Sequence, residues 1–374
     1  MKAAYDYLIV GSGLFGAVFA NRMKDAGKRC LIVEKRRHTG GNVFCEKIEG
    51  IDVHRYGAHI FHTNDEKIWS YVNKFSAFNN YVNSPLANYQ GRLYNLPFNM
   101  NTFNMLWGVT TPAEAISRIE MEKKNFNIIH ARNLEEQAIS MVGFDLYEKF
   151  IKHYTEKQWG RKANELPASI IKRIPLRFTY DNNYFNDRFQ GIPVDGYNSL
   201  INKLIDGIEV KINFDYFKNR ESVKNVAKKT VFTGKIDEYF EYKFGCLEYR
   251  SLSFQDQILD IDNYQGNAVI NFTDATTDHT RIYEHKHFTF GKQPGTVITK
   301  EFPLAYSKGA EAFYPICDEK NKITYAKYKE LARLDQATIF GGRLAEYKYY
   351  DMHQVIGSAL RQADLEVTLG NTKM

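Results

Sequence analysis

The chain has 374 residues, of which 44% are hydrophobic, and a formal net charge of +6 from 50 basic and 44 acidic residues. Because this length exceeds one typical core, we expect two or three domains of a soluble globular protein. The basic residues are dispersed, which argues against a nucleic-acid partner and favours a few arginines facing an anionic small ligand. The sequence has no run of about 20 apolar residues, so we predict no membrane span and a cytoplasmic protein. No metal site is predicted, and the cysteines, which lack metal-ligand spacing, are expected to be reduced thiols: Cys30, Cys45, Cys246 and Cys317.

The N-terminal segment is predicted to form a βαβ unit. A buried strand at Tyr7–Val10 runs into the glycine motif Gly11–Gly16, and a helical stretch extends to Met23. The next strand, Arg29–Val33, ends at Glu34, which lies 34 − 11 = 23 positions after Gly11. Strand, glycine motif, helix, strand and acidic residue in this order are the fingerprint of a dinucleotide-binding site.

Each part of this fingerprint has a role in binding a dinucleotide. Gly11 permits the tight turn, Gly13 lets the backbone approach a pyrophosphate, and Gly16 lets the helix pack on the strand. The amides at the helix N-terminus favour the phosphate charge. Glu34 can accept both hydroxyl protons of an adenosine ribose and would repel a 2′-phosphate.

Two further glycine pairs favour FAD over a nicotinamide cofactor. Gly40-Gly41 follows Glu34 and offers a second close approach to phosphate, although an ordinary left-handed turn would use the same residues. Near the C-terminus, a strand at Ala337–Phe340 leads into Gly341-Gly342, and a helical pattern then runs from His353 to Gln362 before a polar tail. A late strand, glycine pair and helix suit the ribityl chain and pyrophosphate of a flavin.

The segment from Thr111 to Trp159 is predicted to be a helical insert. Thr111 is expected to cap its first helix and Asn133 its second. An earlier helix is expected to be capped by Thr63 or Asn64.

The periodic pattern stops between Lys162 and Gln190, where Pro167 and Pro175 interrupt the chain. We interpret this segment as exposed, with a mobile lid near residues 165–178. Arg173 at its centre could close over a diphosphate, although an exposed arginine is more often only solvated.

The last third of the chain has sequence patterns typical of β-strands. Residues 230–234 resemble a return into the nucleotide-binding sheet, and β-type alternation follows at 247–252, 268–272, 281–288 and 297–301. Arg250 and Arg281 lie on separate strands, and the planar guanidinium of each suits phosphate oxygens.

Several distinctive runs identify a family resemblance: Tyr56–Thr63, Asn95–Phe103, Tyr154–Gly160, Asp181–Phe185, Gly191–Pro193, Glu248–Leu252 and Phe340–His353. With these runs the chain closely resembles the bacterial UDP-galactopyranose mutases over nearly its whole length, without a departure at any motif position. The resemblance implies an α/β fold with a Rossmann-like FAD-binding domain, a small helical domain and an antiparallel β-sheet domain.

The resemblance also implies domain boundaries and a homodimer. The discontinuous FAD-binding domain would comprise residues 1–80, 191–243 and 305–374. The helical domain, with the dimer contacts, would comprise residues 98–165. The substrate-binding sheet domain, including the lid, would comprise residues 81–97, 166–190 and 244–304.

The implied activity is the reversible ring contraction of UDP-galactopyranose to UDP-galactofuranose, which supplies galactofuranose for cell-surface polysaccharide. The family's reaction is redox-neutral but needs reduced FAD, whose N5 atom is thought to attack the anomeric carbon. The ring then opens and closes again through the 4-hydroxyl group, and UDP returns. The sequence agrees with this mechanism, because it shows no Cys–His pair, metal cluster or evident carboxylate pair to act as the nucleophile.

Site residues are carried over by position from the resemblance. Cofactor-binding positions are Gly11, Ser12, Gly13, Phe15, Gly16, Glu34, Lys35, Gly41, Asn42, His59, Ile60, Arg343, Asp351 and Met352. Substrate-binding positions are Asn83, Phe150, Tyr154, Trp159, Arg173, Tyr184, Phe185, Arg250, Asn271, Arg281, Tyr314 and Tyr349. Catalytic positions are Arg173, Arg281 and His62.

Two other readings stay open on the residues alone. A flavin oxidoreductase of the amine oxidase type shares the glycine motif and the glycine pair, but it would oxidise its substrate. A non-catalytic nucleotide-binding or regulatory protein could share the fold, but it would not depend on reduction. Within the mutase reading, a 2-acetamido sugar stays open as an alternative substrate.

Overall fold

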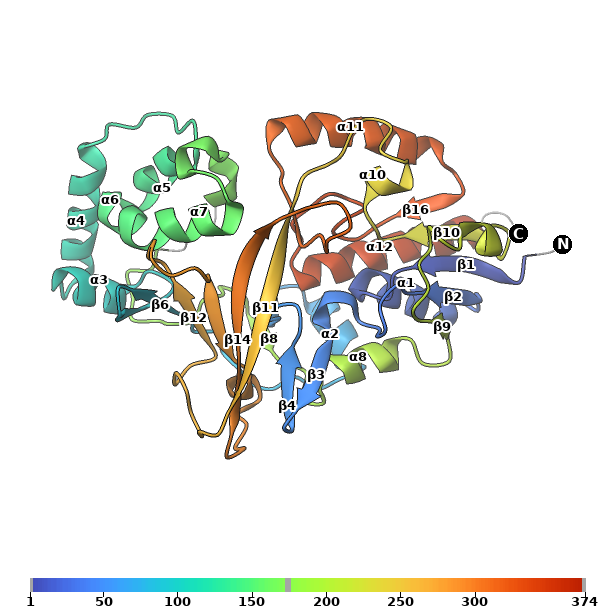
Figure 1. Cartoon of the computed structure of the whole chain (residues 1–374), viewed down its shortest axis with the longest axis horizontal. Helices are drawn as coiled ribbons and strands as arrows, with labels where there is room; N and C mark the ends of the chain where they lie inside the picture. The colour runs from blue at the N-terminus through green and yellow to red at the C-terminus, as the bar shows by residue number, and fades with distance from the viewer. Residues whose placement is uncertain (1–2, 172–175, 372–374) are drawn as a thin grey trace.

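A five-stranded parallel sheet carries both glycine-rich ends of the chain (Figure 1). The structure is a computed structural model that describes residues 3–171 and 176–371. The strand order is β16-β10-β1-β2-β9, and every neighbouring pair is parallel. The strands are β1 (Tyr5–Val10), β2 (Cys30–Val33), β9 (Glu209–Lys211), β10 (Ala227–Phe232) and β16 (Thr338–Phe340). The predicted βαβ unit and the predicted return strand are therefore confirmed.

Helices cover both faces of this sheet because its strands are apolar on both sides. Ile9 and Ile32 pack with α1 (Leu14–Asp25), α8 (Gly196–Leu204) and α12 (Met352–Asn371). The alternate residues Leu8 and Leu31 pack on the other side with Phe232, near α10 (Ile236–Tyr239) and α11 (Glu319–Leu334). This burial on both faces is typical of doubly wound α/β proteins.

A seven-stranded sheet lies between the parallel sheet and the helical unit (Figure 1). Its order is β15-β11-β14-β13-β12-β6-β7. The strands are β6 (Leu86–Tyr89), β7 (Arg92–Asn95), β11 (Tyr249–Leu259), β12 (Val269–Phe272), β13 (Arg281–Glu284), β14 (Thr296–Ala305) and β15 (Tyr314–Pro315). All pairs are antiparallel except β6 with β12, so the predicted antiparallel sheet contains one parallel pair. No hairpin joins β6 to β12, so chain connectivity does not force them to run in opposite directions.

The helical insert forms a separate cluster at one end of this sheet (Figure 1). It contains α3 (Met100–Trp107), α4 (Pro112–Lys124), α5 (Leu134–Val142), α6 (Phe144–Leu146), a π-helical turn (Tyr147–Lys152) and α7 (His153–Trp159). Thr111 and Glu114 form a capping box on α4, and Asn133 caps α5, as predicted. Gly160 in a left-handed conformation ends α7.

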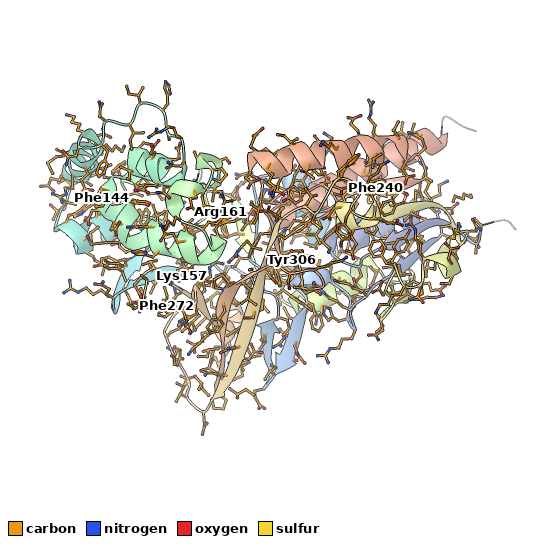
Figure 2. All side chains as sticks on the ribbon, turned by 45° about the horizontal axis from the view of Figure 1, so that its top comes forward. Phe144, Lys157, Arg161, Phe240, Phe272 and Tyr306 are labelled. Carbon is orange, nitrogen blue, oxygen red and sulfur yellow. The ribbon has the colours of Figure 1, made fainter. Side chains whose placement is uncertain are left out.

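Lys157 and Arg161 help to join the helical unit to the rest of the molecule. Lys157 on α7 donates hydrogen bonds to the carbonyl oxygens of Phe272, Thr277 and His279 (Figure 2). Arg161 pairs with Asp318 at 3.4 Å. At the other boundary of the large sheet, Lys235 donates to Tyr306 at 2.6 Å. Two small sheets, β3 (Cys45–Ile48) with β4 (Ile51–His54) and β5 (Phe61–Thr63) with β8 (Phe189–Gly191), complete the frame.

The cap of α2 (Glu66–Asn73) differs from the predicted one. The Asp65 carboxylate accepts from the amides of Lys67 and Ile68, whereas we expected Thr63 or Asn64 in this role. The Thr63 hydroxyl instead accepts from the amide of Asp65. A charged acceptor next to the first turn therefore caps the helix, and the threonine supports it.

One strand and the C-terminal helix end at other residues than predicted. The strand predicted over 281–288 ends at Glu284, and His285–Thr289 form a 3-10 turn in which buried Lys286 donates to the Gln293 carbonyl. The C-terminal helix continues to Asn371 in place of a polar tail, because Glu366 is anchored by Tyr7 and Lys229. Among the described residues, no helix is long and apolar enough to cross a membrane.

Two buried histidines predict acid sensitivity. Burial lowers the pKa of His285 to about 4. Burial also lowers the pKa of His54 well below its usual value, and the nearby rings of His285 and His59 lower that pKa as well. The Asp256 carboxylate opposes this shift at His285, and Arg55 adds to it. Both folded-state pKa values lie below the unfolded value of about 6.5, so the unfolded chain binds more protons as the pH falls.

We therefore expect the free energy of unfolding to be greatest above pH 6.5 and to fall between pH 6.5 and 4. The slope is up to about 1.4 kcal/mol per pH unit for each histidine. Urea unfolding at pH 7 and pH 5 measures this loss, and replacing exposed His130 with alanine should not change it. Equal stability at the two pH values would contradict the neutral buried pair.

Candidate functional site

The carboxyl ends of three parallel strands bring the two glycine motifs together. Gly11 follows β1, Thr233 follows β10 and Gly341 follows β16. Gly11 has a φ of +104°, and a Cβ atom there would collide with the Thr233 hydroxyl. A Cβ atom on Gly341 would collide with the Phe15 ring. Only glycines permit this close approach of segments more than 200 positions apart in the chain.

The N-terminus of α1 fits the pyrophosphate of a dinucleotide. No side chain caps this helix, and its first turn holds no acidic residue, so its amides are available to an anion. A Cβ atom on Gly16 would lie closer than 3.0 Å to the Gly11 carbonyl oxygen, and one on Gly41 would lie 2.9 Å from the Gly13 Cα atom. The glycines therefore let the backbone segments around the helix N-terminus pack closely against one another, as the dinucleotide fingerprint requires.

Glu34 is held in place by the glycine loop itself. Its carboxylate accepts from the amide and the hydroxyl of Ser12 at 2.9 and 2.8 Å, and from the amide of Arg36 at 2.9 Å. The residue is 5% exposed. A carboxylate has about four acceptor positions, so one position stays available for a ribose hydroxyl.

Arg36 is a cation at this site that sequence reasoning missed. It pairs with Glu311 at 2.7 Å and donates to Asn42 at 3.1 Å, while predicted Lys35 pairs with the same carboxylate at 3.3 Å. Its guanidinium lies 4.2 Å from the centre of the Tyr56 ring. The sequence signal that could have indicated Arg36 was its position two residues after Glu34.

Replacing Glu34 with alanine is expected to weaken FAD binding by about 1.5–3 kcal/mol, because the ribose loses a charged acceptor. Fluorescence titration of the apoprotein with FAD measures this change. Glu366→Ala is the matched control, since it removes another buried, paired carboxylate of the same domain. Unchanged FAD affinity in Glu34→Ala would show that this carboxylate does not bind the ribose.

The predicted cofactor-side residues His59 and Arg343 lie close together. Burial, with a smaller contribution from the charge of Arg343, lowers the pKa of His59 to about 4. His59 Nδ1 lies 2.7 Å from the Gly57 carbonyl oxygen. Ile60 packs against the main core, so this loop connects the core to the site.

A second cofactor-side group contains predicted His62. Its ring stacks on Phe185 with centroids 3.8 Å apart, and its Nδ1 contacts Asp187. Asp351 and His353 lie at the start of α12, beside Met352. Ligand atoms of His62, Asp351 and His353 lie within 4.8 Å of one another, so the absence of a metal site stays a prediction.

Predicted Arg281 lies in a network of phenol and carboxylate groups. Its Nε donates to Tyr154 at 2.7 Å, its Nη1 lies 3.4 Å from the Tyr283 hydroxyl, and Glu301 lies 4.0 Å away. Burial opposes its charge, but Tyr154, Tyr283 and Glu301 outweigh burial and raise the pKa of Arg281. Tyr283 donates to Glu301, which holds the pair together. Sequence reasoning missed both of these buried partners.

Arg343 connects the cofactor side to the substrate side. Its guanidinium lies 5.9 and 5.7 Å from the ring centres of Tyr314 and Tyr349, which stack on each other at 5.2 Å. Charges from Arg281 and Arg343 both act on Tyr314, whose pKa burial raises well above its usual value. The two predicted sets of residues therefore meet at this tyrosine pair.

Predicted Arg250 has a structural contact that the sequence did not indicate. Its Nε donates to the Gln158 carbonyl at 2.8 Å, at the end of α7. Tyr314 lies opposite it in the sheet. Arg250 therefore fixes the helix end that carries Trp159, which is partly buried.

The remaining predicted substrate residues divide into site and core positions. Asn83 is buried, its Oδ1 atom has no partner among the described residues, and its carbonyl oxygen accepts from the Tyr184 amide. Asn271 lies opposite Arg281 in the sheet. Phe150 is 4% exposed and packs among Tyr94 and Phe98, as a core ring does. Arg173, at the centre of the predicted lid, lies outside the described residues.

Comparisons with known proteins agree with this arrangement. The family model described as UDP-galactopyranose mutase matches residues 149–349, and one described as an NAD(P)-binding Rossmann-like domain matches residues 9–75. A dTDP-fucopyranose mutase from Escherichia coli is 37% identical over 368 residues, covering 96% of this chain and 98% of the relative. A protein described as "Probable UDP-galactopyranose mutase" from Klebsiella pneumoniae is 38% identical over 365 residues, covering 96% of this chain and 94% of the relative.

Solved structures extend the likeness in fold. A crystal structure of reduced UDP-galactopyranose mutase superposes with a TM-score of 0.73 at 12% identity, covering 98% of this chain and 96% of the other. A putative protoporphyrinogen oxidase from Exiguobacterium sp. 255-15 gives a TM-score of 0.65 at 12% identity, covering 98% of this chain and all of the other. These likenesses show that the fold is shared with both proteins.

Proposed function

The chain belongs to the UDP-galactopyranose mutase family, a family of flavin-dependent isomerases, and we propose that it interconverts UDP-galactopyranose and UDP-galactofuranose with reduced FAD. One observation carries this proposal beyond family membership. Arg343 contacts the Tyr314–Tyr349 pair on one side and influences His59 on the other, so the proposed cofactor and substrate sites are contiguous. Contiguity is needed because the sugar carbon must reach the cofactor.

The proposed roles of the chain's own residues follow from their chemistry. Bound reduced FAD would supply the nucleophile for the anomeric carbon. Arg281 would bind the diphosphate, with Tyr314 and Tyr349 as hydroxyl donors to the same oxygens. Fixed charge at this point stabilises the departing UDP and keeps it in place for its return. Arg250 would join this clamp, and Arg173 is assigned to it by the resemblance alone.

Other predicted residues would surround the sugar and the base. Asn83 presents a buried side-chain oxygen, Oδ1, without a partner among the described residues, which suits a sugar hydroxyl. Trp159 and Tyr154 offer ring faces for the uracil or the sugar. His62 and Phe185 stack on each other in the second cofactor-side group and would help to exclude water.

The experiment that tests this function uses purified protein reduced with dithionite under anaerobic conditions. Incubation with UDP-galactofuranose should yield UDP-galactopyranose, separated by chromatography. The Escherichia coli relative makes dTDP-fucopyranose a second candidate substrate, so dTDP-fucofuranose is assayed in parallel. Conversion of only the dTDP sugar would reassign the substrate within the family, and conversion of neither would reject the proposed function.

The helical unit supports the proposed homodimer. It exposes Ile129 (80%), Met105 (54%), Met121 (50%), Phe126 (43%) and Phe144 (39%), and the rings of Phe126 and Phe144 stack at 5.2 Å. Apolar side chains that gather on one exposed unit are typical of an interaction surface. The cytoplasmic location and the supply of galactofuranose to cell-surface polysaccharide also stay predictions.

We expect light scattering to give twice the chain mass for the native protein and the chain mass for Ile129→Asp combined with Phe126→Asp, because a buried charge in the interface is costly. Ile323→Asp is the matched control, since Ile323 is 55% exposed on α11. A monomeric native protein would reject the dimer.

A further inference from the structure

A chain of hydrogen bonds joins strand β14 to the loop that carries His59. The Thr299 hydroxyl on β14 lies 2.7 Å from Asp256 Oδ1 and 2.7 Å from His285 Nε2. His285 Nδ1 accepts from the backbone amide of His54 at 3.3 Å, and His54 Nδ1 accepts from the backbone amide of His59 at 3.1 Å. We refer to these residues, Asp256, Thr299, His285, His54 and His59, as the Thr299 chain.

The direction of each bond is fixed by the backbone amides. An amide can only donate, so Nδ1 of His285 and Nδ1 of His54 must both be acceptors, and each ring carries its proton on Nε2. Nε2 of His285 therefore donates to Thr299, whose hydroxyl donates onward to Asp256. Arg55 pairs with the other oxygen of Asp256 and fixes the end of the chain.

Burial keeps this arrangement in one state. His54 is 2% exposed, His285 is 1% exposed and Thr299 is 1% exposed. Phe288 stacks on the His54 ring at 4.9 Å, and Tyr197 meets its edge. Since water cannot replace a lost partner here, loss of the Thr299 hydroxyl would leave the buried Nε2 proton of His285 without an acceptor.

Strand β14 also holds the other half of the site. Glu301 lies two residues after Thr299, on the same face of the strand, and accepts from Tyr283 and Thr280. Glu301 also faces Arg281 at 4.0 Å. Gly57, in the His59 loop, approaches the same two residues: a Cβ atom there would lie 3.5 Å from Glu301 and 3.6 Å from the Tyr283 hydroxyl. One strand therefore contacts both the loop of the proposed cofactor site and the arginine of the proposed substrate site.

We propose that Thr299, His285 and His54 are positioning residues that hold the His59 loop against the cofactor site, in register with Arg281. This inference rests on the proposed function for the identity of the two sites. It assigns no chemistry to the three residues, which act only through the backbone of the His59 loop.

The test compares three substitutions on β14. Thr299→Val removes the hydroxyl at nearly constant volume, and Thr299→Ser restores it. Thr296→Val is the matched control, because it removes another buried hydroxyl of the same strand. That hydroxyl donates to Glu284, which is not part of the Thr299 chain. Two quantities are measured for each: amide hydrogen exchange of residues 55–60 in the purified protein, and the dissociation constant for FAD.

We expect Thr299→Val to speed exchange of residues 55–60 and to weaken FAD binding, each by about tenfold. Thr299→Ser should restore both to within about twofold, and Thr296→Val should leave both unchanged even where it lowers the melting temperature. Equal effects of Thr299→Val and Thr296→Val, or no effect of Thr299→Val on exchange, would overturn the proposal.

The two readouts keep this test separate from the proposed function. Neither depends on turnover, so a protein that binds FAD but converts no sugar would reject the proposed function and still decide the role of Thr299. If the native protein bound no FAD, the coupling to a cofactor site would be overturned directly.

Discussion

Replacing Arg281 with alanine is expected to lower kcat/KM for UDP-galactofuranose by roughly 30-fold to several thousandfold. This range corresponds to the roughly 2–5 kcal/mol lost when one member of a buried charge pair is truncated. In the folded protein this guanidinium is already oriented by Tyr154 and Tyr283 and charged in the presence of Glu301. It is therefore preorganised for a diphosphate, and its loss also leaves the Glu301 carboxylate without its cation.

The variants are chosen to separate charge from geometry. Arg281→Lys keeps the charge but loses the planar fork, so it should recover only part of the activity. Arg333→Ala, on exposed α11, is the control for loss of an arginine outside the site. FAD affinity should stay within about twofold in all three variants, because the arginine faces the substrate side. Full activity in Arg281→Ala would remove this residue from the clamp.

The second large effect is dependence on reduction. Oxidised protein in air should show almost no turnover, and dithionite-reduced protein should be fully active, because the flavin must be electron-rich to act as the nucleophile. Turnover is measured on one preparation by reduction, reoxidation in air and a second reduction, so that the same molecules serve as their own control. Equal rates in both states would reject the role proposed for reduced FAD.

Local sequence patterns were sufficient to predict the cofactor end of the molecule. Gly11, Gly16 and Glu34 follow one another within a single βαβ unit, where chain order and hydrogen-bonded turns determine the geometry. Thr111 and Asn133 were predicted correctly as helix caps because capping depends on the next three residues alone. The strand-like run at 281–288 indicated Arg281, and the resemblance then predicted roles for Arg281 and Arg343.

The missed features depend on contacts between distant segments. Thr233 touches Gly11 only because β10 returns beside β1, and Glu301 meets Arg281 only across β14 and β13. His285 looked like part of an alternating strand, and its place in the Thr299 chain depends on a backbone amide 231 positions away. No local period or spacing encodes such pairings. Asp65 was missed for a simpler reason. Thr63, Asn64 and Asp65 are adjacent and all of a type that can cap a helix, and in the structure the Asp65 carboxylate caps α2.

The shared fold leaves a flavin oxidoreductase as the principal competing account. The structural likeness to a putative protoporphyrinogen oxidase reflects the fold at 12% identity. An oxidoreductase and a mutase would both bind FAD and both respond to dithionite. They differ in whether electrons leave the flavin in each catalytic cycle.

One measurement tests that difference directly. The flavin is reduced with one equivalent of dithionite, excess reagent is removed under anaerobic conditions, and excess UDP-galactofuranose is added. Product and the visible absorbance of oxidised flavin are followed together. The account predicts many equivalents of UDP-galactopyranose per flavin while the flavin stays reduced. Consumption of about one substrate equivalent per flavin to a reduced product, with the return of oxidised flavin, would show net electron transfer and contradict the account.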